Sequence, residues 1–395
     1  MAHKIASSTY GLTEEQLSIR DAIDQLCKPF DDEYWRDGDR ERAYPTEMVD
    51  ALYDEGWMSM LIPSEYGGGG ARISDAAVVL EQLERNGCHA GAVRAGMYTM
   101  GSVLRHGSDE QKSRFLPQIA DGSLRLQSFG VTEPDAGSDT TRIRTFAVRQ
   151  GDKYIVNGSK IFTSRVQHSD MILLLTRTTN REDAAKPSAG MTTFLVDLNE
   201  AQEKGWITAN PIRTMVNHET NELTIANLEV PVENRIGEEG EGFKVILSGM
   251  NAERILATSE YVGQGMHLLG RAVQYASERE VFGRPIGMNQ GIQFPIAQAY
   301  ADLEAASLMR WRAAAMYEAG DNPRFEVNGA KLLASQALWK AANAAFDTFG
   351  GYAVAEEYGI ERHFREARLP SIAPVSNNVV LAGIAHGTLG LPKSF

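Results

Sequence analysis

A run of small and hydroxyl-bearing residues lies near the middle of the chain, at residues 129–139. It reads Phe-Gly-Val-Thr-Glu-Pro-Asp-Ala-Gly-Ser-Asp and begins with residues of β type. Backbone amides and hydroxyls in such a turn can donate hydrogen bonds to the edge of a heteroaromatic ring or to a diphosphate. The same residues are equally typical of a plain capped turn. The run by itself therefore leaves both interpretations open.

The segments before this run have helical periodicity. Thr13 and Gln16 have the spacing of a capping box, which predicts that a helix begins there. Apolar residues recur at helical spacing in three later ranges, 45–56, 74–85 and 109–120. The four glycines at 67–70 predict a flexible loop rather than a phosphate cradle, because no strand precedes them and no Lys-Ser/Thr pair follows.

Short β-rich runs between turn residues replace the helical pattern from residue 126 to residue 232. Examples of these runs are 153–156, 171–175 and 192–196. The pair Asn157-Gly158 is typical of a tight hairpin turn. These signals predict an antiparallel β domain, with an exposed polar loop at 178–188.

Long alanine-rich helical segments fill the last part of the chain, at 243–278, 293–319 and 326–349. Gly263-Gln264-Gly265 lies inside this helical pattern with no strand before it, so it is not expected to be a dinucleotide fingerprint. The order of elements predicts an α+β fold. We expect a helical domain at 1–125, a β domain at 126–235 and a second helical domain at 236–395.

The bulk properties exclude several classes of function. The chain has 395 residues and a formal net charge of −13, which argues against nucleic acid or an anionic membrane as the main partner. Cys27 and Cys88 lack metal-ligand spacing, so we expect buried thiols and no metal site. Residues 1–5 lack the apolar core of a leader, and no apolar run is long enough to span a bilayer. The expected location is the cytoplasm.

Several segments together resemble the acyl-CoA dehydrogenase family. Residues 131–134 (Val-Thr-Glu-Pro) and 136–139 (Ala-Gly-Ser-Asp) are similar to its flavin-binding signature. Residues 157–164 (Asn-Gly-Ser-Lys-Ile-Phe-Thr-Ser) resemble its second flavin strand. The resemblance continues in the family's order at 279–286 with Gln290, at 349–352 and at 365–368. It implies N-terminal helical, middle antiparallel β and C-terminal four-helix-bundle-like domains, in agreement with the order of elements.

The resemblance also implies FAD as the cofactor and an acyl-CoA thioester as the substrate. The residues that it places against the flavin ring are Phe129, Val131, Thr132, Phe162 and Ser164. The residues that match other FAD contacts, the first three of them across a subunit interface, are Arg279, Phe282, Gln290, Gly351, Ser376 and Asn378. Ser138 matches a contact to the pyrophosphate of FAD or CoA, while Asp347 stands where Gln is common.

The family's reaction needs a carboxylate that removes the α-proton while a hydride passes from the β-carbon to flavin N5. A dry pocket raises the pKa of such a base towards neutral pH. Many relatives carry this Glu at the position of Pro374, so that carboxylate is absent here. A minority, such as isovaleryl-CoA and long-chain acyl-CoA dehydrogenases, place it before an Arg on another helix, which matches Glu253. We predict Glu253 as the base and Asn251 and Arg254 as CoA contacts; an ordinary helix carboxylate paired with a nearby Arg is the alternative for Glu253.

Pro374 has a second consequence, because proline lacks the N–H with which the family holds the thioester oxygen. Either the alignment slips so that Val375 donates, or a ribityl hydroxyl of FAD and another donor replace that bond. Ala373 stands where a bulky Tyr is common, and together with Pro374 it predicts room for a branched or cyclic acyl group. Three further side chains either line the acyl pocket or pack in the core: Met97, Tyr98 and Met100.

Three functions fit these residues. The first is an acyl-CoA dehydrogenase that passes electrons to an electron-transferring flavoprotein. The second is an oxidase or a monooxygenase on the same fold, which the missing Glu motivates. The third is a non-catalytic flavin-binding protein linked to DNA, against which the acidic charge argues. The resemblance also implies a homotetramer, built as a dimer of dimers.

Overall fold

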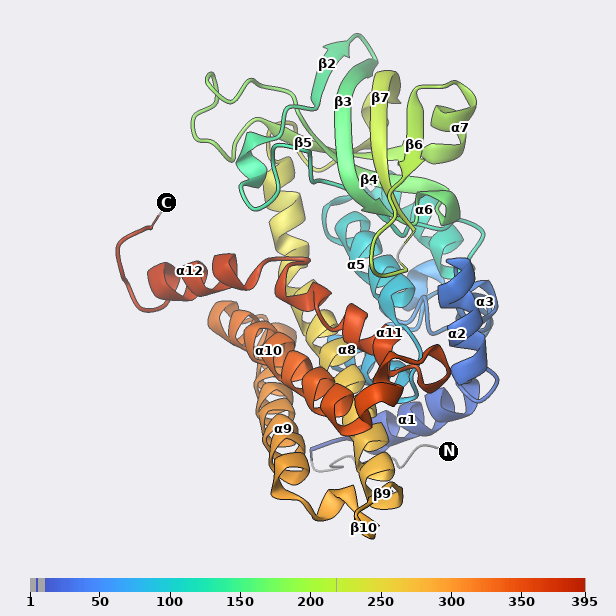
Figure 1. Ribbon diagram of the computed structural model, residues 1–395. Coiled ribbons are helices and arrows are strands. Elements are labelled where there is room, and N and C mark those ends of the chain that lie inside the picture. The colour runs from blue at the N-terminus through green and yellow to red at the C-terminus, as the bar shows by residue number, and fades with distance from the viewer. Residues whose placement is uncertain (1–4, 6–10, 218, 395) are drawn as a thin grey trace. The chain divides into compact units, whose positions relative to one another are not determined.

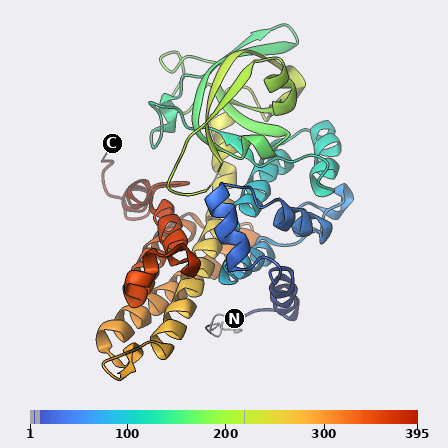
Figure 2. The same cartoon turned by 45° about the vertical axis from the view of Figure 1, so that its right-hand side comes forward.

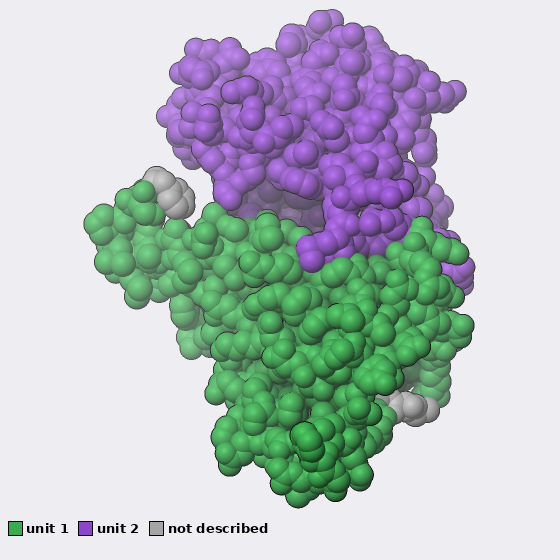
Figure 3. Space-filling model, in the orientation of Figure 1, with its two compact units in different colours: residues 1–41, 72–90, 251–395 green, residues 42–71, 91–250 purple. Residues whose placement is uncertain are grey.

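The computed structural model describes residues 5, 11–217 and 219–394. The chain falls into two compact units (Figure 3): a helical unit of residues 1–41, 72–90 and 251–395, and a β unit of residues 42–71 and 91–250. Residues 1–4, which belong to the segment searched for a leader, lie outside the described residues. The division into domains at residues 125 and 235 stays a prediction.

The helical unit holds the long helices of the chain (Figure 1). Its elements are α1 (Glu14–Leu26), α2 (Asp32–Glu41), α4 (Ile73–Arg85), most of α8 (Gly242–Glu278), β9 (Glu280–Val281), β10 (Arg284–Pro285), α9 (Gln290–Glu318), α10 (Arg324–Phe349), α11 (Ile360–Glu366) and α12 (Asn377–Gly387). The predicted capping box of α1 is confirmed. The backbone N–H of Gln16 donates to Oγ1 of Thr13 at 3.2 Å, and the backbone N–H of Thr13 donates to Oε1 of Gln16 at 3.2 Å.

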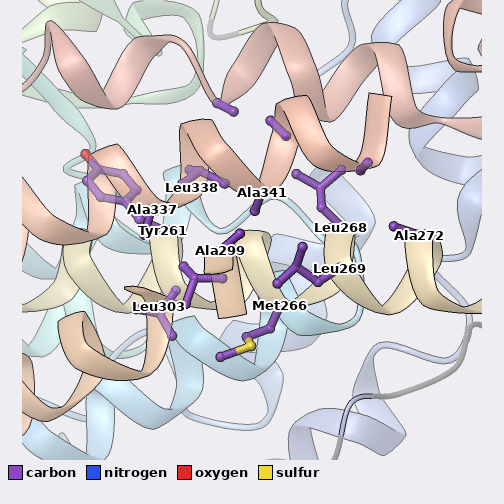
Figure 4. Packing of buried hydrophobic residues seen from close by; sticks show 14 of the residues in the cluster. Tyr261, Met266, Leu268, Leu269, Ala272, Ala299, Leu303, Ala337, Leu338 and Ala341 are labelled. Atoms are coloured by element: carbon purple, nitrogen blue, oxygen red, sulfur yellow. The ribbon is translucent and has the colours of Figure 1, made fainter. Parts of the chain in front are cut away.

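Small residues let α8 pack closely on its neighbours in the core of the helical unit. Figure 4 shows Leu268 and Leu269 of α8 among buried side chains of α9 and α10. A Cβ added to Gly265 would lie 2.7 Å from the side chain of Leu303 on α9, and a Cβ on Gly263 would lie 2.4 Å from the carbonyl oxygen of Glu81 on α4. The Gly-Gln-Gly run is therefore a packing feature of a helix, as predicted.

The β unit contains an eight-stranded sheet together with shorter helices. The helices are α3 (Thr46–Asp54), α5 (Gly91–His106), α6 (Asp109–Ala120) and α7 (Leu198–Glu203). The strands are β1 (Ser128–Gly130), β2 (Phe146–Gln150), β3 (Lys153–Ser164), β4 (Met171–Arg177), β5 (Met191–Asp197), β6 (Ile207–Pro211), β7 (Thr220–Pro231) and β8 (Arg235–Ile236). Their order is β6-β7-β3-β2-β4-β5-β8, and β1 pairs with β4.

Most neighbouring strands of this sheet are antiparallel, as the turn signals predict. The longest pair is β3 with β7, which lie side by side in Figures 1 and 2. β1 pairs with β4 in parallel, and β2 makes one parallel pair with β4. All seven residues of β4 are buried, which explains why its first five residues, 171–175, are all apolar rather than alternating. The chain thus has the predicted order of helical, β and helical segments.

The predicted turn at Asn157-Gly158 is wrong, because β3 runs straight through both residues. Its register against β7 shifts between Val156 and Gly158, which marks a β-bulge. Oδ1 of Asn157 accepts a hydrogen bond from the backbone N–H of Asn227 at 2.8 Å. Glycine is required because a Cβ at position 158 would lie 2.5 Å from Oγ1 of Thr145. The same residue pair thus favours a bulge as well as a turn.

The glycines at 67–70 form a loop, as predicted, but their amides are already engaged. The backbone N–H of Gly70 donates to the carbonyl oxygen of Ile62 at 2.8 Å. A Cβ on Gly68 would lie 2.2 Å from the same oxygen. The run therefore serves close packing against the preceding chain rather than holding a phosphate.

Cys27 and Cys88 are buried free thiols, as predicted. Among the described residues, no group of three or more His, Cys, Asp or Glu side chains is arranged to hold a metal ion. None of the helices in the described ranges is long and apolar enough to cross a membrane.

Candidate active site

A buried ion pair between Lys160 and Glu133 holds part of the run 129–139 in place. The run begins at β1 and passes over β3, where the side chain of Lys160 is fully buried. Nζ of Lys160 donates to Oε1 of Glu133 at 2.8 Å and to the carbonyl oxygen of Val131 at 3.1 Å. The backbone N–H of Ile161 donates to the carbonyl oxygen of Thr132 at 2.9 Å. These bonds hold Val131 and Thr132 in one place relative to β3.

Both partners of this ion pair have shifted pKa values. Burial lowers the pKa of Lys160 to about 8, although the carboxylate of Glu133 opposes the shift. Burial alone would raise the pKa of Glu133, but the ammonium of Lys160 and hydrogen bonds from Thr145 and Arg144 bring it below its ordinary value. The pair is therefore charged at neutral pH, in a region that excludes water.

Phe162 stands out of the sheet on a strained backbone. Its φ is +57°, in the left-handed region that side chains other than Gly rarely adopt, and its side chain is 61% exposed. The register of β3 against β7 shifts between Lys160 and Thr163, so a bulge aims this ring away from the sheet. Backbone strain of this kind is concentrated at ligand sites. The exposed ring of Phe162 is therefore a flat apolar surface, and it directly follows Ile161, whose backbone N–H binds Thr132.

The other predicted flavin contacts of the β unit lie on the same strands. Phe129 of β1 is partly buried, and its ring centre lies 5.7 Å from that of Tyr98 on α5, edge to face. Ser164 ends β3, and its carbonyl oxygen accepts a hydrogen bond from Oγ of Ser128 at 3.1 Å. Ser138 is exposed in the loop between β1 and β2. The six residues predicted for this half of the site thus lie on or next to β1 and β3, or in the loop between β1 and β2.

Met97 and Met100 of α5 are both buried. Met100 belongs to the apolar core of the β unit, which supports plain packing for this residue. Tyr98, by contrast, contacts Phe129 and is only partly buried. Of the three, Tyr98 therefore stays a prediction for the acyl pocket.

A cavity in the helical unit is lined by three of the other predicted FAD contacts. Its volume is about 640 Å³, and Arg279, Phe282 and Gly351 all line it. Two further lining residues are Arg284 and Asp347. The cavity does not include Gln290, which begins α9 next to the lining residue Asn289.

Two arginines and four aromatic residues are among the lining residues of this cavity. The guanidinium of Arg279 lies 5.9 Å from the ring centre of Tyr352, and the rings of Tyr275 and Phe349 stack at 4.2 Å. Arginine is suited to a diphosphate and aromatic faces are suited to an adenine ring. The residues present therefore fit the adenylate half of FAD. The carboxylate of Asp347 is the exception, because it would repel a phosphate.

The predicted base lies on the first part of α8 in the helical unit. The side chain of Glu253 is only 7% exposed, and the next residues, Ile255 and Leu256, are fully buried, as predicted. Burial lowers the pKa of Arg254, and the carboxylate of Glu253 opposes that shift. Nε of Arg254 is buried without a hydrogen-bond partner among the described residues, so it is available to a ligand. Asn251 is partly buried just before it on the same helix.

The segment that replaces the family's usual base connects α11 to α12. The peptide bond between Ala373 and Pro374 is cis, and Pro374 is exposed. Oγ of Ser376 accepts a hydrogen bond from the backbone N–H of Val379 at 3.4 Å, so this side chain caps α12. Asn378 is exposed in the first turn of that helix. None of the residues from 370 to 378 is Asp or Glu.

Sequence reasoning missed the side chains that hold this segment in place. Lys331 of α10 donates to three oxygen atoms of the segment, and Tyr261 of α8 donates to a fourth. The available signal was Lys331 itself, a lone cation in the apolar run Gly-Ala-Lys-Leu-Leu-Ala. A buried lysine in such a run needs several acceptors.

Comparison with known proteins places the chain in a sequence family along nearly its whole length. Residues 13–123 match the acyl-CoA dehydrogenase N-terminal domain, residues 128–228 the middle domain and residues 240–389 the C-terminal domain. Acyl-CoA dehydrogenase FadE12 of Mycobacterium tuberculosis is 32% identical over 388 residues, covering 97% of this chain and 98% of the relative. Cyclohex-1-ene-1-carbonyl-CoA dehydrogenase of Syntrophus aciditrophicus is 34% identical, over 93% of this chain and 88% of the relative.

Solved structures also resemble this chain over nearly its whole length. One of them, described as the electron transferring flavoprotein of Acidaminococcus fermentans, superposes with a TM-score of 0.89. It is 30% identical in sequence and covers 97% of this chain and 100% of that chain.

Proposed function

Because the chain belongs to the acyl-CoA dehydrogenase family, we propose that it oxidises the Cα–Cβ bond of an acyl-CoA thioester with Glu253 as the α-proton base. The family makes it an oxidoreductase that acts on acyl-CoA, with FAD as its cofactor. The identity of the base and of the acyl chain are the parts that we propose.

The burial of Glu253 is the observation that supports its role most strongly. A carboxylate that is 7% exposed is shielded from water, as a general base for a weakly acidic α-proton needs to be. The segment from 370 to 378 offers no Asp or Glu in its place. In the proposed reaction the carboxylate of Glu253 takes the α-proton and becomes a neutral acid.

The cofactor contacts follow from the two groups of residues. Val131, Thr132 and Phe162 would hold the flavin ring, and Arg279 and Phe282 would hold the adenylate half across a subunit interface. When bound, FAD supplies the acceptor for the hydride that leaves the β-carbon. The same assignment makes Ser138, Ser164, Gln290, Gly351, Ser376 and Asn378 further contacts. We also propose that the segments 1–125, 126–235 and 236–395 are the family's three domains.

Ala373 and Pro374 support a branched or cyclic acyl group; a long acyl chain is the third class of acyl group that we propose. Ala373 leaves free the volume that a Tyr fills in many relatives. The name of the Syntrophus relative includes a cyclic acyl group, which is consistent with this substrate class. Asn251 and Arg254 would bind the CoA moiety, and the buried Nε of Arg254 supports that assignment.

The proposed electron acceptor is an electron-transferring flavoprotein. The description of the Acidaminococcus structure names such a protein, which supports this choice. A homotetramer built as a dimer of dimers would complete each FAD site. Location in the cytoplasm stays a prediction.

An oxidase or monooxygenase on the same fold is the second candidate. Pro374 favours it, because the position lacks both the usual carboxylate and the N–H that holds the thioester oxygen. Loss of one such donor costs on the order of 100-fold in rate. Hydrogen peroxide release at the rate of substrate turnover would distinguish the oxidase.

Anaerobic bleaching of the flavin by a panel of acyl-CoAs tests the proposed function. The panel compares straight, branched and cyclic acyl groups of equal carbon number, for the wild type and for Glu253→Gln. We expect bleaching by the branched or cyclic members and a loss of at least ~100-fold in the variant. Bleaching of Glu253→Gln at the wild-type rate would remove Glu253 from its role, and a wild type that no acyl-CoA bleaches would refute the activity.

A further inference from the structure

The ammonium of Lys331 is bound by three oxygen atoms from one segment. Lys331 lies on α10 and its side chain is fully buried. Nζ donates to the carbonyl oxygen of Pro370 at 2.7 Å, to that of Val375 at 2.6 Å and to Oδ1 of Asn377 at 2.9 Å. Three acceptors saturate a lysine. The bonds close the segment from 370 to 377 around a single point on α10.

Two other side chains tighten the same arrangement. Oγ of Ser335, one turn after Lys331 on α10, lies 3.1 Å from Oδ1 of Asn377 and 2.9 Å from the carbonyl oxygen of Leu332, so the two acceptors share its one proton. The hydroxyl of Tyr261 on α8 donates to the carbonyl oxygen of Ala373 at 3.4 Å. The segment is therefore bound from two helices, α10 and α8.

Tyr261 connects this segment to the part of α8 that carries Glu253. The two residues are about two turns apart and lie on the same face of the helix. Ala257, one turn from each, is fully buried on that face. The carbonyl oxygen of Ala373 is thus tied to the face of α8 from which Glu253 projects.

The charges of the two elements also act on each other. Burial lowers the pKa of Lys331 to about 8; Arg254 adds to this shift and Glu253 opposes it. The carboxylate of Glu253 also opposes the lowering of the pKa of Arg254 by burial. The charged groups that shift the pKa of Lys331 are thus Arg254 and the proposed base, both on α8.

We propose that Lys331 is a positioning residue, which holds the segment from 370 to 377 against α8 and thereby sets where the thioester meets Glu253. The inference rests on the proposed function. Pro374 gives it particular weight, because a segment that cannot donate an N–H at this position depends on its remaining groups being well placed. Lys331 itself touches neither the substrate nor the flavin in this account.

The variant Lys331→Met keeps the length of the side chain and removes both its donors and its charge. Displacement of a reacting group by about 1 Å costs on the order of 100-fold in rate. We expect kcat for flavin reduction to fall by ~10- to 100-fold and KM to change by less than about 3-fold.

Lys340→Met is the matched control, since Lys340 lies on the same helix but is exposed and pairs with Asp302 at 2.6 Å. Ser335→Ala is a milder variant that removes one bond to Asn377 and keeps Lys331, so it remains informative should Lys331→Met fail to fold. Lys331→Arg keeps the charge and several donors and should recover part of the lost rate.

Hydrogen exchange of the FAD-loaded protein provides a readout apart from activity. Amides in 370–377 should exchange at least ~10-fold faster in Lys331→Met and measurably faster in Ser335→Ala, with no change in Lys340→Met. Wild-type exchange and a wild-type kcat in Lys331→Met would overturn the proposal. A wild type without acyl-CoA activity would refute the proposed function, whereas wild-type activity with unaltered Lys331 variants would refute only this inference.

Discussion

Removal of Lys160 should destabilise the β unit through the carboxylate that it leaves behind. The side chains of Lys160 and Glu133 are 0% and 7% exposed, and Nζ of Lys160 lies 2.8 Å from Oε1 of Glu133. Breaking such a buried pair by removing one partner costs about 3–5 kcal/mol. For Lys160→Met we therefore expect the unfolding midpoint to fall by on the order of 10 °C at pH 7.

The double variant Lys160→Met with Glu133→Gln separates charge from packing. The amide that replaces the carboxylate of Glu133 would be neutral, and its single oxygen could accept a hydrogen bond from one of the two backbone N–H groups, those of Arg144 and Thr145, that now bind separate oxygens of Glu133. Replacing both charges of a buried pair is often close to neutral. The double variant should therefore be more stable than the single one, although it has two changes.

The direction in which the stability of Lys160→Met changes with pH tests the electrostatic explanation. Without the ammonium, burial raises the pKa of Glu133 above that of the unfolded chain. The folded state then binds more protons, so the deficit relative to wild type shrinks as pH falls from about 8 to about 5. Differential scanning fluorimetry at several pH values measures this. A constant deficit, or a double variant as unstable as the single one, would refute the electrostatic reasoning.

Three further perturbations have expected outcomes. Burial and the nearby Arg271 lower the pKa of His267 to about 4, below its ordinary 6.5. As pH falls, the unfolded chain binds this proton first, so the contribution of His267 to stability should be complete above about pH 6.5 and fall by about 1 kcal/mol per pH unit down to about pH 4. His267→Gln should flatten this part of the curve in a pH series of melts. Gly263→Ala places a Cβ 2.4 Å from a backbone oxygen of α4 and should cost at least about 2 kcal/mol in thermal unfolding, whereas Gly291→Ala, with nothing within 4 Å, should not. Phe162→Gly relieves about 1 kcal/mol of backbone strain, so the FAD-free protein should melt no lower than wild type while its affinity for FAD drops in a titration; a lower melt with unchanged affinity would contradict the assigned role.

The long helices could be predicted because their signals are local. The pattern for 109–120 matches α6 throughout, and 326–349 matches α10 to within two residues. α2 is absent from the prediction, since it is short and polar with one buried residue, Trp35. α5 is also absent from it, because its glycines weaken helical propensity, although they allow close packing.

The candidate site could be predicted in its residues but not in what supports them. Phe129, Val131 and Thr132 can be identified from a short motif, which is a property of neighbouring positions. Lys160 with Glu133 and Lys331 with residues 370–377 depend on contacts between segments 27 or more positions apart. Asn157-Gly158 shows the same limit, because the approach of Thr145 decides between a turn and a bulge.

The central claim is that Glu253 removes the α-proton, and solvent exchange of that proton tests it most directly. An acyl-CoA that bleaches the wild type is incubated in D₂O, and incorporation of deuterium at the α-carbon is followed by NMR for the wild type, Glu253→Gln and Glu253→Asp. We predict that Glu253→Gln slows incorporation by ~10²- to 10⁴-fold and that Glu253→Asp retains an intermediate rate. Incorporation in Glu253→Gln at the wild-type rate would contradict the account.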